Sequence, residues 1–566
     1  MLKSSICCSI IIWKIATSFL FIIFNVWNFY QLLEIFPLNI KKEYEYIIVG
    51  TGVGGSTVAS GIESEDVLIL EAGTEPSWLM NIPMLTPILQ NGPYDWNFYT
   101  ESQEKSAKGL KGRQIHFPLG KVVGGSHVLN MQIYMRGHPE DHRVYVNGEY
   151  NFHRDIERYF EQFERDLGPE EVKFRTKLAD AFQEAGQESG YGPFESVRVT
   201  QKHGMRFTVA DFYKELNRNG HRVVSGAFVT RVTFEEDLAT ASGVEFTKSG
   251  KEYSVRATKG VILSAGTVGS AKILLQSGIG PMNHLKNVGI PVRVNLPVGE
   301  NLIDHVSTGY NILLLNESLS LDWSDILTPK SLCSFAKGEG PWTMPGCESS
   351  AILSLSSDIP NLQFMVLPVG LTQDFGVHLK NIANIDDKVW EKYFGKMLGM
   401  SAATILPVVL HPKSQGVIRL KDSNPYSSPV IDPQYLSHPE DREVLLKGIR
   451  ILQKLIDTEA MQKIGAEINP LPFPGCENFP WDSRDYWLCY IEHLTLTTFH
   501  PAGTCSMGSV VDRNFRVLHM EKLFVVDASV MPKLPSGNPM GTIGMLAHRF
   551  LAVNGISKHF PTEISS

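Results

Sequence analysis

Residues 46–55 read Tyr46-Ile47-Ile48-Val49-Gly50-Thr51-Gly52-Val53-Gly54-Gly55, an apolar run that leads directly into a glycine-rich turn. The β-branched end of this run is typical of a strand buried in a parallel sheet. In such a turn Gly50 allows the bend, Gly52 lets the backbone approach a pyrophosphate, and Gly55 lets the next helix lie close to the strand. The stretch therefore predicts the first strand and the phosphate-binding turn of a dinucleotide-binding α/β fold.

The residues after the turn fit the same fold. Residues 56–61 are expected to open a helix, whose free N–H groups and partial positive charge would face the phosphates. Residues 67–70 form a second apolar strand, and Glu71 stands at its end, sixteen residues after Gly55. A carboxylate at that place can accept hydrogen bonds from the hydroxyls of an adenosine ribose. These features predict a dinucleotide site without distinguishing FAD from NAD.

Length and charge restrict the class of protein. The 566 residues are 43% hydrophobic and 20% charged, which is ordinary for a globular protein. This length is sufficient for two domains. The net charge is −8, from 52 basic and 60 acidic residues, and no basic run or stripe occurs. Nucleic acid is therefore not expected as a partner.

Residues 1–43 differ from the rest of the chain. A basic start, an apolar block over residues 15–24 and aromatic residues up to Tyr30 are typical of a secretory signal or an uncleaved signal-anchor. The alternative, a buried helix of a cytosolic protein, has no neighbouring element that would cover it. We expect a protein of the secretory pathway, either secreted or anchored to a membrane through residues 10–36, with a lumenal or extracellular catalytic domain.

Cysteine spacing gives a negative prediction. No C-x-x-C pair occurs, so neither a zinc knuckle nor a redox dithiol is expected, and we predict no metal site. The odd number of cysteines after the N-terminal segment allows one or two disulfides, and spacing alone leaves their connectivity open. These cysteines are Cys333, Cys347, Cys476, Cys489 and Cys505.

Two segments near the C-terminus carry groups suited to the chemistry of an alcohol. They are Phe499-His500-Pro501-Ala502-Gly503 and Ser536-Gly537-Asn538-Pro539. A histidine has an unperturbed pKa of about 6.5, so near pH 7 it is largely neutral and can take the proton of an alcohol. An asparagine amide can donate a hydrogen bond to the same oxygen as negative charge develops on it. We therefore take His500 and Asn538 as candidate catalytic residues.

Three longer segments resemble the signatures of the glucose–methanol–choline (GMC) oxidoreductases. They are Gly120-Lys121-Val122-Val123-Gly124-Gly125-Ser126-His127-Val128-Leu129-Asn130, Gly266-Thr267-Val268-Gly269-Ser270-Ala271 and Leu296-Pro297-Val298-Gly299-Glu300-Asn301-Leu302-Ile303-Asp304-His305. The resemblance extends over residues 44–548, practically everything after the N-terminal segment. It implies an FAD-dependent oxidoreductase that oxidises the CH–OH group of an alcohol by hydride transfer to the flavin, with His500 as the base.

The resemblance also implies which residues surround the cofactor. Pyrophosphate and flavin would be lined by Gly124, Gly125, Ser126 and Asn130, adenine would meet the backbone of Val229, and Asp527 and Ala528 would close over the phosphate and ribityl chain. Some members of the family attach FAD covalently through a histidine. The matching position here is Leu129, which has no nucleophilic atom, and His127 is interpreted as an ordinary histidine. FAD is therefore expected to bind non-covalently.

The expected fold class is α/β: a Rossmann-like FAD-binding domain joined to an α+β substrate-binding domain that is built on an antiparallel sheet. Residues 1–43 would be the signal or anchor, 44–305 the N-terminal part of the FAD-binding domain, and 306–498 the substrate-binding domain. Residues 499–566 would return to the FAD-binding domain and carry His500 and Asn538.

Three segments of the substrate-binding half have clear patterns. Residues 405–410 and 416–420 are expected as strands of a sheet over the flavin. Because Pro407 cannot donate a hydrogen bond, the first of them is placed at an edge or a bulge. Residues 440–461 show the apolar spacing of an amphipathic helix.

The resemblance has departures and leaves alternatives. Residues 139–168 look short and atypical, a change that would reshape the substrate entrance or weaken FAD binding. Sugar, choline-like, retinoid and steroid alcohols are open as substrates, and oxygen or a quinone-like compound as the electron acceptor. The main alternative is a catalytically inactive paralogue that acts as a binding protein. Non-redox chemistry on the same fold is another, as is an NAD-linked dehydrogenase, which accounts only for residues 50–71.

Overall fold

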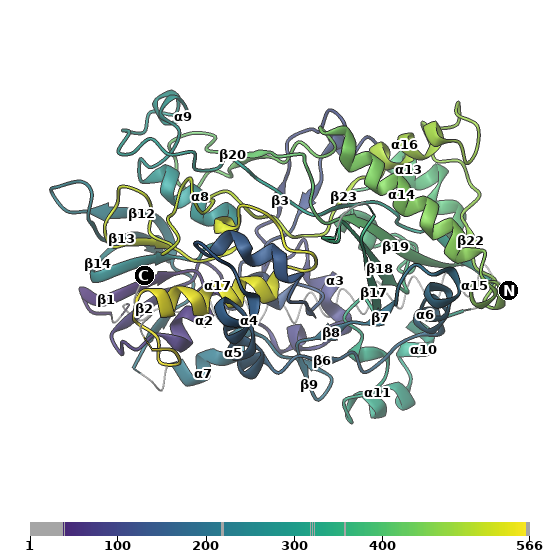
Figure 1. Ribbon diagram of the computed structural model, residues 1–566, viewed down its shortest axis with the longest axis horizontal. Helices are drawn as coiled ribbons and strands as arrows, with labels where there is room; N and C mark the ends of the chain where they lie inside the picture. Colours follow the sequence, from purple (N-terminus) through teal and green to yellow (C-terminus); the bar gives the residue numbers. More distant parts are fainter. Residues whose placement is uncertain are drawn as a thin grey trace.

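The structure is a computed structural model, which describes residues 38, 40–216, 220–316, 318–319, 321, 323–355 and 358–561. Two large β-sheets lie toward opposite ends of the long axis (Figure 1). The expected signal or anchor over residues 10–36 lies outside the described residues. Among the helices that the structure describes, none has the length and apolar character needed to cross a membrane.

The first sheet has seven strands in the order β11-β2-β1-β14-β13-β12, with β24 beside β14. Parallel pairing joins β11 to β2, β2 to β1, β1 to β14 and β14 to β24, whereas β13 and β12 are antiparallel. The strands are β1 (Glu43–Val49), β2 (Val67–Leu70), β11 (Arg222–Val224), β12 (Phe228–Phe234), β13 (Ala241–Lys248), β14 (Lys251–Leu263) and β24 (Leu523–Val525).

The predicted strand–turn–helix–strand unit is present. The apolar end of β1 and all of β2 are buried, because neighbouring strands and helices cover both faces of the parallel part. Helix α2 (Val53–Gly61) follows the glycine turn and packs against α17 (Met540–Val553), which lies near the C-terminus (Figure 1). Helix α8 (Gly266–Gln276) begins where β14 ends. The first sheet thus draws its strands from residues 43–263 and from residues 523–525.

The second sheet has eight antiparallel strands in the order β22-β16-β19-β18-β17-β7; β15 joins it beside β19, and β23 pairs with β15. Helix α14 (Pro439–Ile456) packs on β18 and β19 (Figure 1). The strands are β7 (Glu195–Ser196), β15 (Val306–Ser307), β16 (Leu313–Leu315), β17 (Ser349–Leu353), β18 (Leu362–Leu367), β19 (Ser401–Val409), β22 (Glu467–Ile468) and β23 (Leu496–Thr497). The domain boundaries given above stay a prediction.

Three expectations about the second half need correction. Strand β19 is internal to the sheet, and Pro407 is accommodated because it lies opposite the break between β16 and β15, where the neighbouring chain does not pair with it. Strand β20 (Val417–Arg419) pairs only with β21 (Val430–Asp432) and does not belong to the large sheet. The helix expected over residues 440–461 is divided, because α14 ends at Ile456 and α15 (Glu459–Lys463) follows.

Shorter elements cover and connect the two sheets. The helices are α3 (Thr86–Leu89), α4 (Phe152–Asp155), α5 (Glu157–Leu167), α6 (Lys177–Ser189), α7 (Tyr213–Leu216), α9 (Met282–Asn287), α10 (Trp323–Ile326), α11 (Pro329–Phe335), α12 (Leu379–Ile382), α13 (Asp387–Lys392) and α16 (Arg484–His493). The strands are β3 (Phe98–Tyr99), β4 (His116–Phe117), β5 (Ile133–Tyr134), β6 (Glu170–Glu171), β8 (Arg198–Val199), β9 (Gln201–Lys202) and β10 (Met205–Arg206).

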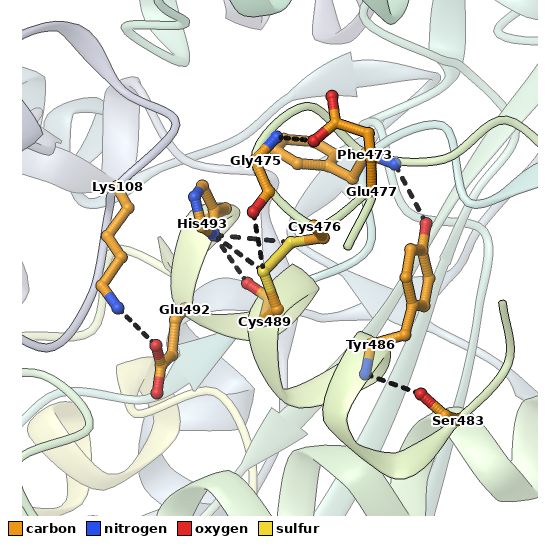
Figure 2. Close-up of a disulfide and its surroundings, with 10 residues drawn as sticks. All are labelled: Lys108, Phe473, Gly475, Cys476, Glu477, Ser483, Tyr486, Cys489, Glu492 and His493. Carbon is orange, nitrogen blue, oxygen red and sulfur yellow. Dashed lines mark hydrogen bonds and ion pairs between the residues drawn. A yellow bond between two sulfur atoms is a disulfide. The ribbon is translucent and has the colours of Figure 1, made fainter. Parts of the chain in front are cut away.

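A disulfide, whose pairing the spacing left open, joins Cys476 to Cys489 on α16 (Figure 2). The Cα atoms are 5.8 Å apart. His493, one turn further along α16, has its Nδ1 3.6 Å and 3.5 Å from the two sulfur atoms and 2.8 Å from the carbonyl oxygen of Cys489. The bridge therefore fastens the loop before α16 to that helix. Among the described residues, Cys333, Cys347 and Cys505 are free.

Candidate active site

The glycine turn after β1 has two kinds of glycine. A Cβ atom on Gly50 would lie 2.3 Å from the carbonyl oxygen of Ser264, and Gly50 has a φ of +99°. A Cβ atom on Gly55 would lie 2.1 Å from the carbonyl oxygen of Gly50. By contrast, a Cβ atom on Gly52 would meet no atom within 4 Å. Gly50 and Gly55 are thus required by packing, whereas Gly52 borders open space.

A cavity of about 410 Å³ runs from this turn toward the C-terminal candidate residues. Its volume is within the usual range for a small-molecule site. Nine of the residues singled out from the sequence line it: Gly50, Gly52, Glu71, Gly125, Ser126, Val229, Asp527, Ala528 and His500. The other four, Gly55, Gly124, Asn130 and Asn538, are not among its lining residues.

Glu71 joins the two glycine turns through Thr51. Its Oε2 accepts hydrogen bonds from the backbone N–H and the hydroxyl of Thr51 at 3.0 and 2.5 Å, and its Oε1 accepts one from the N–H of Gly73 at 2.7 Å. The Thr51 hydroxyl oxygen in turn accepts from the N–H of Gly124 at 3.1 Å. Burial raises the pKa of Glu71. Because Oε1 accepts only one of these bonds, it retains acceptor capacity toward the cavity.

The turn of the first signature lies against the first glycine turn. Gly124 and Gly125 have positive φ values of +99° and +57°, and a Cβ atom on Gly125 would lie 2.9 Å from the Cα of Gly52. Asn130 is turned toward its own loop, because its Oδ1 accepts from the N–H of Gln132 at 2.8 Å. These contacts bring two turns that are distant in sequence to one edge of the cavity.

Arg206 fastens the loop of the first signature, residues 120–130, through hydrogen bonds, and the sequence did not indicate this role. Its guanidinium is buried and donates to the carbonyl oxygens of Met80, His127 and Asn130. Burial lowers the pKa of Arg206 to about 9. No pattern in the sequence links this arginine, on β10, to a loop nearly eighty residues earlier.

Asp527 connects the end of β24 to the start of α8. Its Oδ2 accepts from the N–H of Gly266 at 2.9 Å and the hydroxyl of Ser270 at 2.6 Å, and its Oδ1 accepts from the N–H and hydroxyl of Ser529 at 2.8 and 2.5 Å. Burial raises the pKa of Asp527. Although Asp527 lines the cavity, these four bonds fill its acceptor capacity, so we assign it the task of holding α8 in place.

His500, which lines the cavity, contacts Asn538. Asn538 Nδ2 lies 3.0 Å from His500 Nε2. The backbone N–H of His500 donates to Asp304 Oδ1 at 3.0 Å, and Asp304 also accepts from the hydroxyls of Thr497 and Tyr435. Burial raises the pKa of Asp304 to about 6. The loop that carries the histidine is therefore held by a buried carboxyl group.

Burial also determines the charge state of His500. Burial lowers the pKa of His500 to about 3, although part of the side chain borders the cavity. Its neighbour His305, which lies 3.0 Å away between the Nδ1 atoms, has its pKa lowered by burial as well. Both rings are therefore neutral near pH 7. A neutral imidazole can accept a proton, as a general base must.

Residues 139–168, noted for their unusual sequence, contribute to this site through Asp141. Asp141 Oδ2 accepts from the N–H of Ser536 at 2.6 Å, and Asp141 Oδ1 accepts from the Ser536 hydroxyl at 3.0 Å. Ser536 lies two residues before Asn538. The segment thus fixes the loop that carries the second candidate residue.

The residues of the cavity fit a dinucleotide. Helix α2 begins at Gly52 without a side-chain cap, so its N-terminal N–H groups are open to a phosphate. The far wall near β12 is aromatic: Phe228 stacks on Tyr426 with ring centres 5.4 Å apart and meets Trp96 edge-on at 6.1 Å. A flat base can pack on such rings, while the opposite end of the cavity reaches His500.

Comparison with known proteins identifies the family of this chain. The N-terminal model of the GMC oxidoreductase family matches residues 44–307, and the C-terminal model matches residues 412–547. The chain is 32% identical to an alcohol dehydrogenase [acceptor] of Pseudomonas putida, covering 89% of this chain and 94% of the relative. It is 28% identical to a glucose dehydrogenase [FAD, quinone] of Drosophila melanogaster, covering 90% and 86%.

Among solved structures, pyridoxine 4-oxidase from Mesorbium loti superposes with a TM-score of 0.73 at 26% identity, covering 90% of this chain and 98% of that one. The chain belongs to the GMC oxidoreductases, whose members are FAD-dependent enzymes acting on alcohol-type CH–OH groups. The FAD cofactor and the α/β fold with its antiparallel second sheet, both expected from the sequence, are confirmed.

Proposed function

We propose that His500 takes the hydroxyl proton of the alcohol while Asn538 holds its oxygen. The observation that carries this proposal is the 3.0 Å contact between Asn538 Nδ2 and Nε2 of His500, which lines the cavity. An alcohol oxygen that takes the place of this direct contact, within hydrogen-bond distance of both atoms, would donate its proton to the imidazole and accept a hydrogen bond from the amide. As the proton leaves, the amide dipole stabilises the growing negative charge. FAD, when bound, supplies the acceptor for the hydride.

We also propose that FAD is held non-covalently. The side chain at the family's attachment position is Leu129, which is buried and has no nucleophilic atom. Both ring nitrogens of His127 are engaged, since Nδ1 accepts from the N–H of Val209 at 3.3 Å and Nε2 lies 2.9 Å from the Thr200 hydroxyl oxygen. Acid precipitation should therefore release free FAD into the supernatant. Flavin that stays with the precipitated chain would contradict this.

For the remaining reactants, we propose a small-molecule alcohol as substrate and oxygen or a quinone-like compound as electron acceptor. The names of the relatives support these classes, since one is an alcohol dehydrogenase [acceptor], another a glucose dehydrogenase [FAD, quinone], and a solved relative is an oxidase. Reoxidation of the reduced enzyme, timed in air and in an anaerobic quinone solution, separates the two acceptors. The faster of the two identifies the acceptor class.

We further propose that the chain enters the secretory pathway through residues 10–36. The disulfide Cys476–Cys489 supports this, because such bridges form and persist in oxidising compartments. Fractionation of expressing cells should place the protein in the secreted or membrane fraction. Recovery in the cytosol would contradict the proposal.

The substitution His500→Ala tests the proposed base. It should leave FAD bound and slow flavin reduction by at least about a hundredfold, the usual scale of a lost general base. Rapid-mixing absorbance of the holoenzyme with an oxidisable alcohol, without oxygen, measures this rate. His548→Gln is the control, because His548 is a buried histidine that bonds to Asp166 and does not line the cavity. An unchanged rate in His500→Ala would contradict the assignment.

A further inference from the structure

A continuous line of hydrogen bonds, partly buried at His500 and buried elsewhere, runs through the two candidate catalytic side chains. It begins at the carbonyl oxygen of Leu410 and ends at the carbonyl oxygen of Phe364. Between them lie His305, His500, Asn538, Gln363 and Ser350, joined in that order by contacts of 3.0, 3.0, 3.0, 3.4, 3.1 and 2.8 Å. Both ends are carbonyl groups, which can only accept.

The Leu410 end determines where the proton sits on His500. His305 Nε2 lies 3.0 Å from the Leu410 carbonyl oxygen, so this nitrogen carries a hydrogen. In a neutral ring the other nitrogen, Nδ1, then holds a lone pair. The His500 Nδ1 that faces it at 3.0 Å must therefore donate. It follows that His500 Nε2 holds the lone pair.

A threonine gives the same answer independently. The Thr498 hydroxyl donates to the carbonyl oxygen of His305 at 3.1 Å, so its oxygen acts as an acceptor toward the ring beside it. That oxygen lies 3.0 Å from His500 Nδ1. Both neighbours of His500 Nδ1 thus act as acceptors, and they share the single hydrogen on that nitrogen.

The Phe364 end determines how the Asn538 amide is turned. The Ser350 hydroxyl donates to the Phe364 carbonyl oxygen at 2.8 Å and so accepts from Gln363 Nε2 at 3.1 Å. The same Nε2 donates its second hydrogen to the Asn538 oxygen at 3.4 Å. The Asn538 NH₂ group is consequently the part that faces His500. Gln363 has no exposed surface, and the other neighbour of its Nε2, the Met135 sulfur at 3.7 Å, is a weak acceptor.

We propose that His305 and Gln363 are positioning residues that set the hydrogen positions on His500 and Asn538, so that the alcohol oxygen meets one lone pair and one N–H. The proposal rests on the function proposed above. It assigns a task to a histidine and a glutamine on separate elements, neither of which contacts the alcohol oxygen in the proposed reaction. When His500 gains the alcohol proton, its Nδ1–H donates more strongly to His305, as the imidazole of a serine protease does to its carboxylate.

The charged and titratable groups around His305 determine what a substitution there should do. His500 faces it at Nδ1, and His411 lies on the segment after Leu410, close enough to disfavour a second positive charge. Asp141 lies 3.7 Å from His411 Nε2, and Asp304 precedes His305 in the chain and binds the backbone of His500. A carboxylate placed at residue 305 would add a negative acceptor beside His500 Nδ1.

The test compares His305→Ala with His305→Asp in the FAD-loaded enzyme. His305→Ala should lower the limiting rate of flavin reduction at least about tenfold, with little change in the alcohol concentration that gives half of it. His305→Asp restores an acceptor that cannot donate, so the rate should return, with its acid limb moved to higher pH because a carboxylate favours the charged imidazole. The control His548→Gln should show neither effect.

Gln363→Glu tests the other end. A carboxylate cannot donate to the Asn538 oxygen, so the amide should turn its NH₂ group toward Glu and away from the alcohol. The limiting rate should fall at least about tenfold while FAD remains bound. For chains that lose FAD or do not fold, nitrogen NMR of the unsubstituted holoenzyme gives the tautomer directly. Hydrogen on His500 Nδ1 is expected, and hydrogen on Nε2 would overturn the proposal.

The outcomes separate this inference from the proposed function. A wild-type rate and pH profile in His305→Ala, together with a slow His500→Ala, overturns the positioning role alone. A His305→Asp enzyme that is as slow as His305→Ala at every pH does the same, because it reveals a purely structural role. Normal rates in both His305→Ala and His500→Ala would contradict the assignment of His500 as the base, and with it the proposed function.

Discussion

At the scale of single residues, the glycines of the first turn differ in what a side chain would do. On Gly55 a Cβ atom would overlap the backbone of Gly50, whereas on Gly52 it would enter open space at the cavity. Gly52 also has ordinary backbone angles, with a φ of −66°. The packing of helix against strand therefore depends on Gly55, whereas the space for the cofactor depends on Gly52.

This difference yields a prediction. Gly52→Val should give a folded protein with little or no FAD, because its side chain fills space needed by the pyrophosphate. Gly55→Val should lower the thermal midpoint strongly, since the helix is forced away from the strand. The flavin absorbance per chain and a thermal melt measure the two effects. Normal FAD content in Gly52→Val would contradict the assignment of the turn.

The sequence was informative at this scale where a signature surrounds the residue. Gly50, Gly52, Glu71 and His500 all line the cavity as expected. Thr51, His305, Gln363 and Arg206 received no role, although they hold the site residues in place. Their partners are distant in the sequence and are often backbone carbonyl groups, which leave no local pattern.

At the scale of elements, the segment around Asp141 fixes the position of the loop that carries Asn538. The side chain is almost fully buried and accepts two hydrogen bonds from Ser536. Residues 139–168 looked atypical in the sequence, and a weaker FAD site was one expectation. The structure instead places Asp141 away from the cavity lining and against the loop that carries Asn538.

We therefore predict that Asp141→Asn slows flavin reduction without releasing FAD. The amide nitrogen cannot accept, so one hydrogen bond to Ser536 is lost, which typically costs about 1.5–3 kcal/mol when the acceptor is charged. If about 1.4 kcal/mol of this reaches the transition state, the rate falls roughly tenfold. Rapid-mixing absorbance measures the rate. Asp155→Asn, in the same segment but bonded to Arg154, should have no effect, and equal rates in the two variants would contradict the prediction.

Element boundaries show why pattern reading succeeded in one half and partly failed in the other. The strands over residues 43–49 and 67–70 are continuous apolar runs next to a glycine turn, and both were predicted. The predicted position of β19 at an edge or a bulge was wrong. The prediction assumed that a neighbouring strand pairs along the whole length of an internal strand, where Pro407 could not donate its hydrogen bond. The break between β16 and β15 is a tertiary feature, and no local sequence announces it.

At the scale of the whole molecule, buried histidines link stability to pH. Burial lowers the pKa of ten described histidines: His127, His142, His221, His284, His305, His378, His411, His493, His500 and His548. Below pH 6.5 the unfolded chain binds protons at these sites that the folded chain does not, so stability falls as the pH falls. Burial acts in the opposite direction on five carboxyl groups, Glu71, Asp304, Glu348, Asp374 and Asp527.

Because the histidines outnumber these carboxyl groups, we predict net destabilisation by acid. Each fully affected group contributes up to about 1.4 kcal/mol per pH unit. The thermal midpoint of the protein should therefore decrease continuously from pH 7 to pH 5. Melting curves in a series of buffers of equal ionic strength measure it. A midpoint that rises over this range would show that the buried carboxyl groups dominate.

The arrangement of the two sheets brings together segments that are hundreds of residues apart. The cavity is lined by the turn after β1, by β12 and by His500. The fold class and the cofactor were predictable because long signatures occur in a fixed order. The sequence did not predict that β7 pairs with β17 or that β15 pairs with β23. Each of these pairings involves only two residues of one strand, which is too short for a recognisable pattern.

The central claim is that this chain oxidises an alcohol with a bound flavin, using His500 as the base. The most direct measurement is the absorbance spectrum of the purified full-length protein without oxygen, before and after addition of sugar, choline-like, retinoid and steroid alcohols. We predict a flavin spectrum that bleaches with one of these classes, at a rate that His500→Ala lowers at least about a hundredfold. A flavin that no alcohol reduces, or one that bleaches equally fast in His500→Ala, would contradict the account.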